Sequence, residues 1–305
     1  MASYKLVTYA GPDGPRAGLV IGDQVCDAPK LTGRAADHSV LGILRDWTAA
    51  RERLGDAAAS PAAGQPLATT RLLPPILWPS AIYCAGANYA DHAAEMARAS
   101  GRTPEPDPHT LGLKPWHFLK AGRSTLAADG DTVQITGVSK TMDWEIELAA
   151  VIGLTAKNVT LTDALDYVAG YTVANDLSAR DMGRRPHVPD TAPFKFDWVA
   201  HKNFDGSCPL GPWIVPSRDI PDPQQLGLKL WVNDVIKQDS HTGQMIFTLA
   251  EQIAHLSSRI TLQPGDVILT GTPAGVGAAR PEFLRPGDVV KLWIEDIGTL
   301  SNTMA

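Results

Sequence analysis

Glycine and proline recur so often along this chain that most of its apolar segments are too short for long helices. The 305 residues include 27 Gly and 24 Pro. Short apolar runs bounded by turn-forming residues are typical of β-strands. The sequence therefore predicts a mainly β fold with some α, arranged as a mixed β-sandwich or barrel-like roll and not as a parallel α/β sheet. The expected strands include residues 132–135, 145–152, 170–174, 228–232, 267–270 and 289–294.

The first 75 residues follow a pattern of their own. Short candidate strands within residues 4–28 are separated by turns, and a helical stretch follows at residues 40–54. Residues 57–66, rich in Ala, Pro and Gly, are typical of a linker. We therefore expect two domains, a small β-rich N-terminal domain at residues 1–75 and a larger domain at residues 76–305.

Charge and hydropathy exclude several classes of protein. The formal net charge is −6, and acidic and basic residues are interleaved without the basic cluster of a nucleic-acid-binding protein. Apolar runs such as Leu148–Leu154 are too short to cross a bilayer, and the first residues lack the features of a signal peptide. We therefore expect a cytoplasmic protein with no nucleic-acid partner and no membrane segment. The widely spaced Cys26, Cys84 and Cys208 are expected to be reduced thiols.

Acidic residues lie on two candidate strands. Glu145 and Glu147 are two residues apart, so on a strand they share a face, where their charges repel unless a cation is bound or one of them is protonated. Asp176 follows a second apolar strand and can supply a third carboxylate. Three carboxylates suit a hard divalent cation and leave positions open for a substrate. The alternatives are a solvated strand face for the two glutamates and a turn or capping role for Asp176.

His92 and Glu95 lie three residues apart in a segment that is expected to be a helix over residues 91–100, so they share a helix face. A carboxylate beside an imidazole raises its basicity and fixes its orientation, as a water-activating base requires. Asp91 is expected to cap this helix. An exposed His–Glu pair on the helix surface is the simpler alternative.

Seven segments between Ile82 and Asn302, about three quarters of the chain, resemble the fumarylacetoacetate hydrolase superfamily. They are N-Y-A-D-H-A-A-E at 88–95, H-F-L-K at 117–120, D-W-E-I-E-L-A-A-V-I-G at 143–153, N-D-L-S-A-R-D at 175–181, A-H-K-N-F-D-G-S-C-P-L-G-P at 200–212, P-G-D-V-I-L-T-G-T-P-A-G-V-G at 264–277 and G-T-L-S-N at 298–302. The resemblance is to the branch of acylpyruvases and 2-hydroxyhepta-2,4-diene-1,7-dioate isomerases. It implies a mixed β-sandwich roll as the catalytic domain and a homodimer.

The resemblance also implies roles for the acidic residues and the histidine. Glu145, Glu147 and Asp176 fall where the family places its metal ligands, and the expected ion is Mg²⁺, with Mn²⁺ or Ca²⁺ as alternatives. His92 and Glu95 fall where many members place a water-activating dyad.

Further positions match the substrate-binding part of the family pattern. Lys202 falls on the active-site lysine, and Thr272, which follows Gly271, falls on the loop that meets the substrate carboxylate. Arg180 and Arg184 could receive a second substrate carboxylate, as a guanidinium fork can. A solvated or dimer-facing basic cluster is the alternative for these two arginines.

The chain departs from the family pattern after the A-R-D motif. Many members have a glutamine where this chain has Gly183, and a longer insert, residues 186–198, follows. This insert leaves the identity of the substrate open, because it is expected to shape the pocket.

These residues predict hydrolytic C–C cleavage of an acylpyruvate-type 2,4-dioxo acid, in which His92 and Glu95 activate water and the metal and Lys202 stabilise an enolate. A small 2-oxo carboxylate is thus the expected partner, as in the catabolism of aromatic compounds. Oxaloacetate-type decarboxylation and isomerisation or hydration of a 2-hydroxydienoate remain alternatives, because they use the same platform. A ligand-binding protein without turnover is an alternative of a different class.

Overall fold

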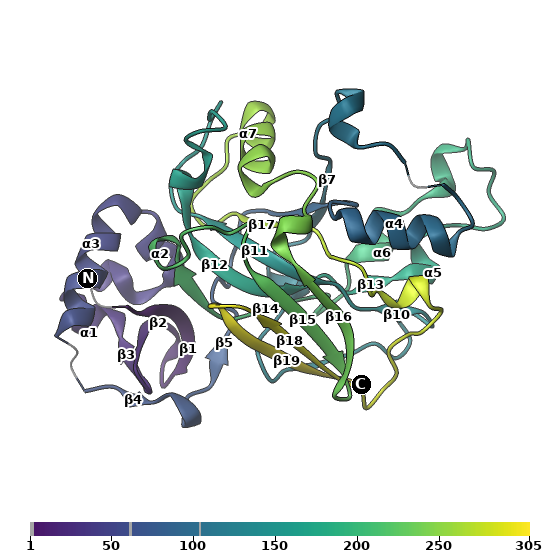
Figure 1. Ribbon diagram of the computed structural model, residues 1–305. Coiled ribbons are helices and arrows are strands. Elements are labelled where there is room, and N and C mark those ends of the chain that lie inside the picture. Colours follow the sequence, from purple (N-terminus) through teal and green to yellow (C-terminus); the bar gives the residue numbers. More distant parts are fainter. Residues whose placement is uncertain (1–2, 61–62, 104) are drawn as a thin grey trace.

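A large, mostly antiparallel sheet runs through the molecule (Figure 1). The protein is described by a computed structural model that covers residues 3–60, 63–103 and 105–305. In spatial order the strands are β4 (Gln65–Pro66), β3 (Gln24–Asp27), β2 (Gly14–Ile21), β1 (Lys5–Gly11), β14 (Cys208–Pro216), β12 (Val168–Asn175), β11 (Ile146–Ile152), β17 (Val267–Leu269), β6 (Ile82–Ala85) and β7 (His117–Lys120), with β5 (Leu72–Leu73) beside β1 and β8 (Leu126–Ala127) beside β14.

A second sheet packs against the central strands of the first. Its strands, in order, are β16 (Val235–His241), β15 (Gly227–Val232), β18 (Val289–Ile294), β19 (Gly298–Met304) and β9 (Thr132–Val133). Buried and more exposed residues alternate along β15 and β18, as expected for a sheet with one face in the core. By contrast, β11 and β12 are buried along their whole length. The mainly β fold with some α is confirmed.

The helices are short and lie around the sheets. The α-helices are α1 (Ala28–Thr32), α2 (Val40–Leu44), α3 (Trp47–Ala59), α4 (Ala90–Ala99), α5 (Arg180–Gly183), α6 (Trp198–Lys202) and α7 (Leu249–Arg259). The 3-10 helices are η1 (Ala35–His38), η2 (Leu67–Thr69), η3 (Pro108–Leu111), η4 (Arg123–Thr125), η5 (Ala164–Tyr167), η6 (Pro193–Lys195), η7 (Ser217–Asp219), η8 (Thr242–Gln244) and η9 (Gly277–Ala279). A two-stranded sheet of β10 (Met142–Asp143) and β13 (Ser178–Ala179) completes the fold. No helix in the described ranges is long and apolar enough to cross a membrane.

Two expectations for the N-terminal part are corrected. The helical stretch expected at residues 40–54 is two helices, because the chain leaves the helix at Arg45 and Asp46 before α3 begins. The linker expected at 57–66 begins later, because α3 continues through Ala59; residues 61–62 of that linker lie outside the described residues.

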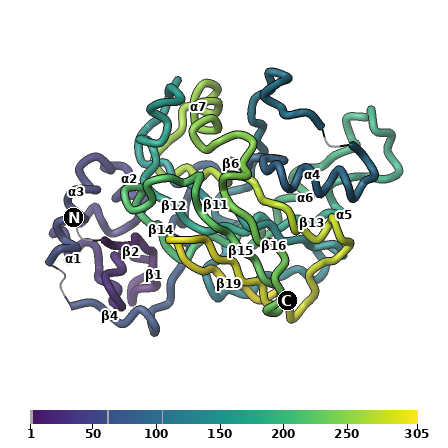
Figure 2. Tube along the Cα trace, viewed as in Figure 1, coloured from purple at the N-terminus to yellow at the C-terminus, as the bar shows by residue number. Residues whose placement is uncertain are grey.

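The N-terminal strands share both the sheet and the core with the rest of the chain. Leu6 in β1 is paired with Ile214 in β14. Both residues belong to one buried cluster that also contains Leu54 of α3 and Leu269 of β17. The trace in Figure 2 shows the N-terminal segment, in purple, at one end of the molecule. The division into separate domains at residues 75 and 76 remains a prediction.

We expect Leu6→Ala to destabilise the whole chain, because a leucine deleted from a core typically costs about 2–5 kcal/mol. Thermal unfolding followed by circular dichroism should show one transition that moves to lower temperature. Leu161→Ala, at an exposed leucine, is the control and should leave the transition in place. Two transitions, of which only one responds to Leu6→Ala, would instead indicate two independently folding domains.

Candidate active site

Pairing of two central strands brings three buried carboxylates together. Glu147 lies in β11, opposite Ala174 of β12, and Asp176 follows the last residue of β12. Glu145 lies just before β11, so the strand expected over residues 145–152 begins one residue later. The carbonyl of Glu145 nevertheless accepts a hydrogen bond from the backbone N–H of Asp176 (2.9 Å). One carboxylate oxygen from each of the three side chains lies within 4.8 Å of the others. The structure thus brings together the three acids expected from the sequence.

Lys202, the last residue of α6, lies between two of these acids. Its Nζ is 2.8 Å from Glu145 Oε2 and 2.6 Å from Asp176 Oδ2. Burial alone lowers the pKa of a lysine, but Asp176 and Glu145 outweigh it and raise the pKa of Lys202. The side chain is therefore an ammonium group that places one positive charge beside the carboxylates.

Lys120, at the end of β7, is a buried cation to which the sequence reasoning gave no role. Its Nζ lies 2.9 Å from Asp176 Oδ1 and donates hydrogen bonds to the carbonyls of Leu177 (3.2 Å) and Ser207 (2.9 Å). It also donates to the carbonyl of Lys202. The lysine therefore ties an acid to the helix that carries Lys202; its position in the H-F-L-K segment was the only sequence signal for it.

Arg180, the first residue of α5, binds two acids. Its Nε donates to Asp143 Oδ2 (2.9 Å) and its Nη2 donates to Glu145 Oε1 (2.5 Å). Burial opposes the charge on Glu145, but Lys202 and Arg180 hold the pKa of this carboxyl below its usual range. Arg180 thus lies at the site, where its guanidinium is committed in part to protein carboxylates.

Glu147 differs from the other acids because its close partner is not a cation. Its Oε2 accepts a hydrogen bond from the backbone N–H of Gly271 (2.7 Å). Burial, and then the charges of Asp176 and Glu145, raise the pKa of Glu147 well above its ordinary value. A cation bound between the carboxylates would favour the charged form instead.

The donors of this cluster fit a divalent cation. Four buried carboxylates, including Asp143, face the three cations Lys120, Arg180 and Lys202, so one negative charge is in excess when all four are ionised. The candidate ligands are all carboxylate oxygens, which hard ions such as Mg²⁺ and Mn²⁺ prefer. In the described part of the chain this is the only such group of potential ligands.

The expected dyad is only half in place. His92, on α4, lines the cavity above the acids, and its Nδ1 is buried with no hydrogen-bond partner among the described residues. Burial lowers the pKa of His92, against the opposing charge of Glu145. Glu95 binds elsewhere, because its Oε2 accepts from the backbone N–H of Gly275 (2.7 Å). The structure therefore brings His92 to the site and uses Glu95 to hold α4 on the loop that contains Gly275.

Asp91 is not at the capping position of this helix, although its Oδ1 accepts a hydrogen bond from the backbone N–H of His92 in the first turn (2.7 Å). The capping position is Tyr89, which makes no side-chain capping bond. Asp91 lies in the first turn, where its Oδ2 accepts from the hydroxyl of Ser240 (2.6 Å) and its Oδ1 from the backbone N–H of Ala274 (3.3 Å). Asp91, like Glu95, fastens α4 to the neighbouring strand and loop.

The loop after β17 reaches the site as expected. Gly271 has a positive φ of 98°, and a Cβ there would lie 2.8 Å from Cβ of Asn88, so a side chain would not fit. Thr272 lines the cavity, but its hydroxyl already donates to the carbonyl of Ile146 (2.9 Å) and accepts from Gln238 (2.9 Å).

Arg184 is not brought to the site. Its side chain is exposed, and its Nη2 lies 2.6 Å from Asp190 Oδ1 within the insert. Its substrate-binding role stays a prediction.

The cavity at this site is small, at about 180 Å³. It is lined by several side chains that the sequence reasoning did not assign to the site: Trp116, Phe118, Trp198 and His201. Burial, with Lys202 and Arg180 adding to it, lowers the pKa of His201 to about 3.

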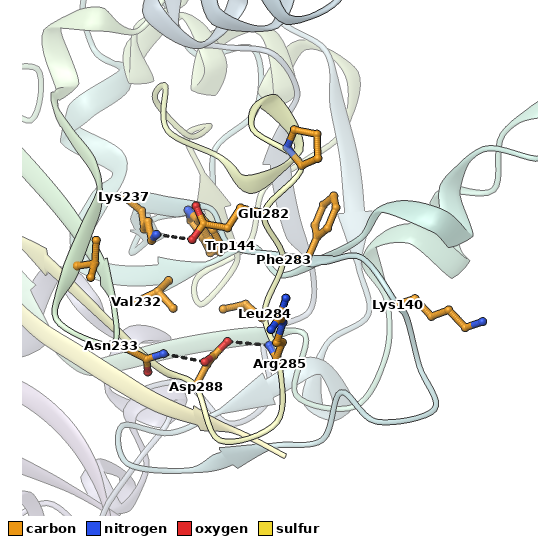
Figure 3. Close-up of a pocket in the computed structure, with 12 residues that line it drawn as sticks. Lys140, Trp144, Val232, Asn233, Lys237, Glu282, Phe283, Leu284, Arg285 and Asp288 are labelled. Atoms are coloured by element: carbon orange, nitrogen blue, oxygen red, sulfur yellow. Dashed lines mark hydrogen bonds and ion pairs between the residues drawn. The ribbon is translucent and has the colours of Figure 1, made fainter.

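A different hollow, of about 510 Å³, is shown in Figure 3. The buried Trp144 is one of the residues that line it. Two of the acids there have partners in the same hollow: Glu282 pairs with Lys237, and Asp288 accepts a hydrogen bond from the side-chain amide of Asn233. Glu145 and Glu147, two of the candidate metal ligands, line the smaller cavity instead.

The chain is similar in sequence to known proteins. Residues 81–305 match the family described as fumarylacetoacetate (FAA) hydrolase, C-terminal. The chain is 38% identical over 310 residues to the mitochondrial oxaloacetate tautomerase of Xenopus laevis, covering 98% of this chain and 90% of that protein.

Solved structures resemble the whole chain. The maleylpyruvate hydrolase of Sphingobium sp. SYK-6, in complex with manganese(II) and pyruvate, has a TM-score of 0.74 at 30% identity and covers 99% of this chain and 98% of that one. The 2-hydroxyhepta-2,4-diene-1,7-dioate isomerase of Mycobacterium marinum has a TM-score of 0.71, also at 30% identity and with the same coverage.

We expect Glu147→Gln and Glu145→Gln to act in opposite ways on the metal-free protein. Glu147→Gln should leave the unfolding temperature unchanged or raise it, because a neutral amide replaces a carboxyl whose ionisation is opposed by burial and by Asp176 and Glu145, and the amide oxygen can still accept from Gly271. Glu145→Gln should lower it, since breaking a buried ion pair typically costs about 3–5 kcal/mol. Thermal unfolding in a chelating buffer measures both.

The increase in unfolding temperature on addition of Mn²⁺ should then measure metal binding separately from the effect of each substitution on the metal-free protein. A ligand at 100 times its Kd stabilises by about 2.7 kcal/mol, so the parent should unfold at a higher temperature with Mn²⁺. Glu147→Gln should lose most of this increase. An undiminished increase in Glu147→Gln would contradict the assignment of Glu147 as a ligand.

Proposed function

The chain belongs to the fumarylacetoacetate hydrolase superfamily, and from its site we propose that it is a divalent-metal-dependent enzyme that interconverts the enol and keto forms of a small, oxaloacetate-like 2-oxo acid. The observation that carries the proposal is the position of His92. It lines the cavity without Glu95, which binds Gly275. One base facing the substrate suffices to move a proton, whereas hydrolysis also needs an oriented water.

We assign Glu145, Glu147 and Asp176 to hold the metal, with Mg²⁺ or Mn²⁺ as the proposed ion. Its chemistry, when bound, is that of a Lewis acid which polarises an oxygen of the substrate. The maleylpyruvate hydrolase structure that contains manganese(II) and pyruvate supports such a site.

The side chains around these ligands then bind the acid and move its proton. An ammonium group has three donors, and Lys202 uses two for Glu145 and Asp176. The third is left to donate to the oxygen on C2, where negative charge develops. In the enol-to-keto direction, His92 delivers a proton to C3, the proton on the C2 oxygen leaves to water, and His92 takes a proton back from water. Arg180 is proposed to face the substrate carboxylate.

The loop at Gly271 and Thr272 is assigned to the substrate carboxylate as well. Both residues are already fixed by bonds to Glu147 and Ile146. Their role would therefore be to shape a rigid wall of the cavity, which orients the acid before the proton is moved.

Hydrolytic C–C cleavage of an acylpyruvate is the second candidate. It is favoured by the fold similarity to maleylpyruvate hydrolase over 99% of the chain. It would require Glu95, whose Oε2 binds Gly275, to reach His92 on the same helix face as well, so that the pair can orient a water molecule. A homodimer in the cytoplasm remains our expectation for either activity.

We expect His92→Ala to lower kcat for oxaloacetate tautomerisation by about 10²–10⁴-fold, the usual contribution of a general acid–base group. Loss of the ultraviolet absorbance of the enol form, with Mg²⁺ present, measures the rate. His38→Ala, an exposed histidine of η1, is the control and should keep the parental rate. A parental rate in His92→Ala would exclude His92 as the proton carrier.

Glu95→Gln distinguishes the two candidates. An amide oxygen still accepts from Gly275, so α4 should stay in place and tautomerisation should continue near the parental rate. Hydrolysis of acetopyruvate, followed by pyruvate formation, should be lost if Glu95 must orient His92. Efficient pyruvate formation by the parent, without enol–keto activity on oxaloacetate, would replace the first candidate by the second.

A further inference from the structure

Four rings form a cluster at one side of the cavity. Trp198 lies at its centre: its ring centroid is 5.3 Å from that of Phe118, nearly parallel at 17°, and 5.4 Å from that of Trp116, edge-on at 63°. It also stacks on His201 at 5.6 Å. All four rings line the cavity. Such contacts between rings fix their orientation beyond what burial alone does.

The cluster is joined to the acid site through one short helix. Trp198 and Lys202 are the first and last residues of α6, which contacts β7, the strand of Phe118. Nζ of Lys202 lies 5.0 Å from the centroid of Phe118. An acid held by Lys202 therefore has the ring cluster as its neighbour on that side of the cavity. His92, on α4, lines the same cavity as Trp198 and Lys202.

Two glycines leave the space that the rings occupy. A Cβ on Gly86 would lie 2.0 Å from Cζ2 of Trp116, so the indole rests directly on the backbone there. A Cβ on Gly183 would lie 2.8 Å from the ring of His201. Gly183 is the position where many family members have glutamine; in this chain, a side chain there would displace His201 from the cluster.

The insert fastens the first turn of α6. The side chain of Asp197 accepts from the backbone N–H of Ala200 (2.9 Å) and from Nη2 of Arg185 (2.7 Å). The backbone N–H of Asp197 donates to the carbonyl of Gly183 (2.9 Å). Asp197 thus fixes the position of the adjacent Trp198, because it is bonded both to residues before the insert and to the first turn of α6. The residue Trp198 is nevertheless 42% exposed, and Trp116 is 45% exposed.

We propose that Trp198 and Trp116 limit the length of the substrate, so that the enzyme accepts a short 2-oxo acid and rejects acids with a bulky tail beyond C4. This inference rests on the proposed function and names its substrate class. The cavity of about 180 Å³ is smaller than the ~300–1,000 Å³ of pockets that hold drug-sized ligands. The two half-exposed indoles are the walls that a longer tail would meet.

Oxamate and N-benzyloxamate test the limit by binding alone. Both carry the carboxylate and adjacent carbonyl of a 2-oxo acid, and they differ in the tail. Calorimetric titration in the presence of Mn²⁺ should show that the parent binds N-benzyloxamate at least about tenfold more weakly than oxamate, since even one methylene in a tight pocket changes selectivity by ~10-fold or more.

Trp198→Ala should tighten the binding of N-benzyloxamate by about tenfold and leave that of oxamate near the parental value. Trp116→Ala is the second variant, which removes the other indole from the same side of the cavity. It tests the proposal if Trp198→Ala does not fold. Phe194→Ala is the matched control, because Phe194 lies in the same insert, is 75% exposed and does not line the cavity. It should change neither affinity.

The outcomes separate this inference from the proposed function. Failure of the parent to bind oxamate with Mn²⁺ would overturn the 2-oxo acid site itself. Equal binding of both compounds by the parent, or an unchanged preference in both tryptophan variants, would overturn the length limit and leave the 2-oxo acid site standing.

Discussion

The excess of buried negative charge at the start of β11 is the constraint on which the rest of the site depends. Burying a charge without compensation is costly, and here four carboxylates are held by only three cations. Each cation comes from a different part of the chain. Lys120 ends β7, Arg180 begins α5, and Lys202 ends α6. The acids therefore draw three separate elements together around the paired ends of β11 and β12.

A small number of hydrogen bonds also positions His92, the proposed base. α4 has few buried residues of its own, and two acids fasten it to the neighbouring chain: Asp91 binds Ser240, and Glu95 binds Gly275. Gly275 is in turn linked to the strand of acids, because its carbonyl accepts from the indole N–H of Trp144 (3.0 Å), the residue before Glu145. The position of His92 above the cavity thus depends on the segment that carries the carboxylates.

The sequence predicted those parts of the site that follow from local pattern. The spacing of Glu145 and Glu147, and the place of Asp176 after a strand, depend on neighbouring residues, and the structure brings the three together. Other contacts of the site join residues that are far apart in the sequence. Lys120 and Ser207 are separated by 87 positions, and Glu95 and Gly275 by 180 positions. The hydrophobic periodicity of a sequence describes local structure, so it cannot predict contacts over such separations. The fold class could be predicted for the same reason as the acids, because short apolar runs between turn residues are a local pattern. The break in the helix at Arg45 could not be predicted, because neither glycine nor proline stands there.

Charge balance also explains why metal and substrate belong together in this cavity. Without a cation, Glu147 is opposed by Asp176 and Glu145, and its pKa is raised well above the ordinary value. With all four carboxylates ionised, a divalent cation reverses the excess, so the site then carries one positive charge. A substrate carboxylate neutralises it, and Lys202 keeps one donor for the oxygen at which charge develops. An uncharged ligand of the same size would leave that positive charge unbalanced in a buried site, so the arrangement selects for an acid before any contact with the tail is made.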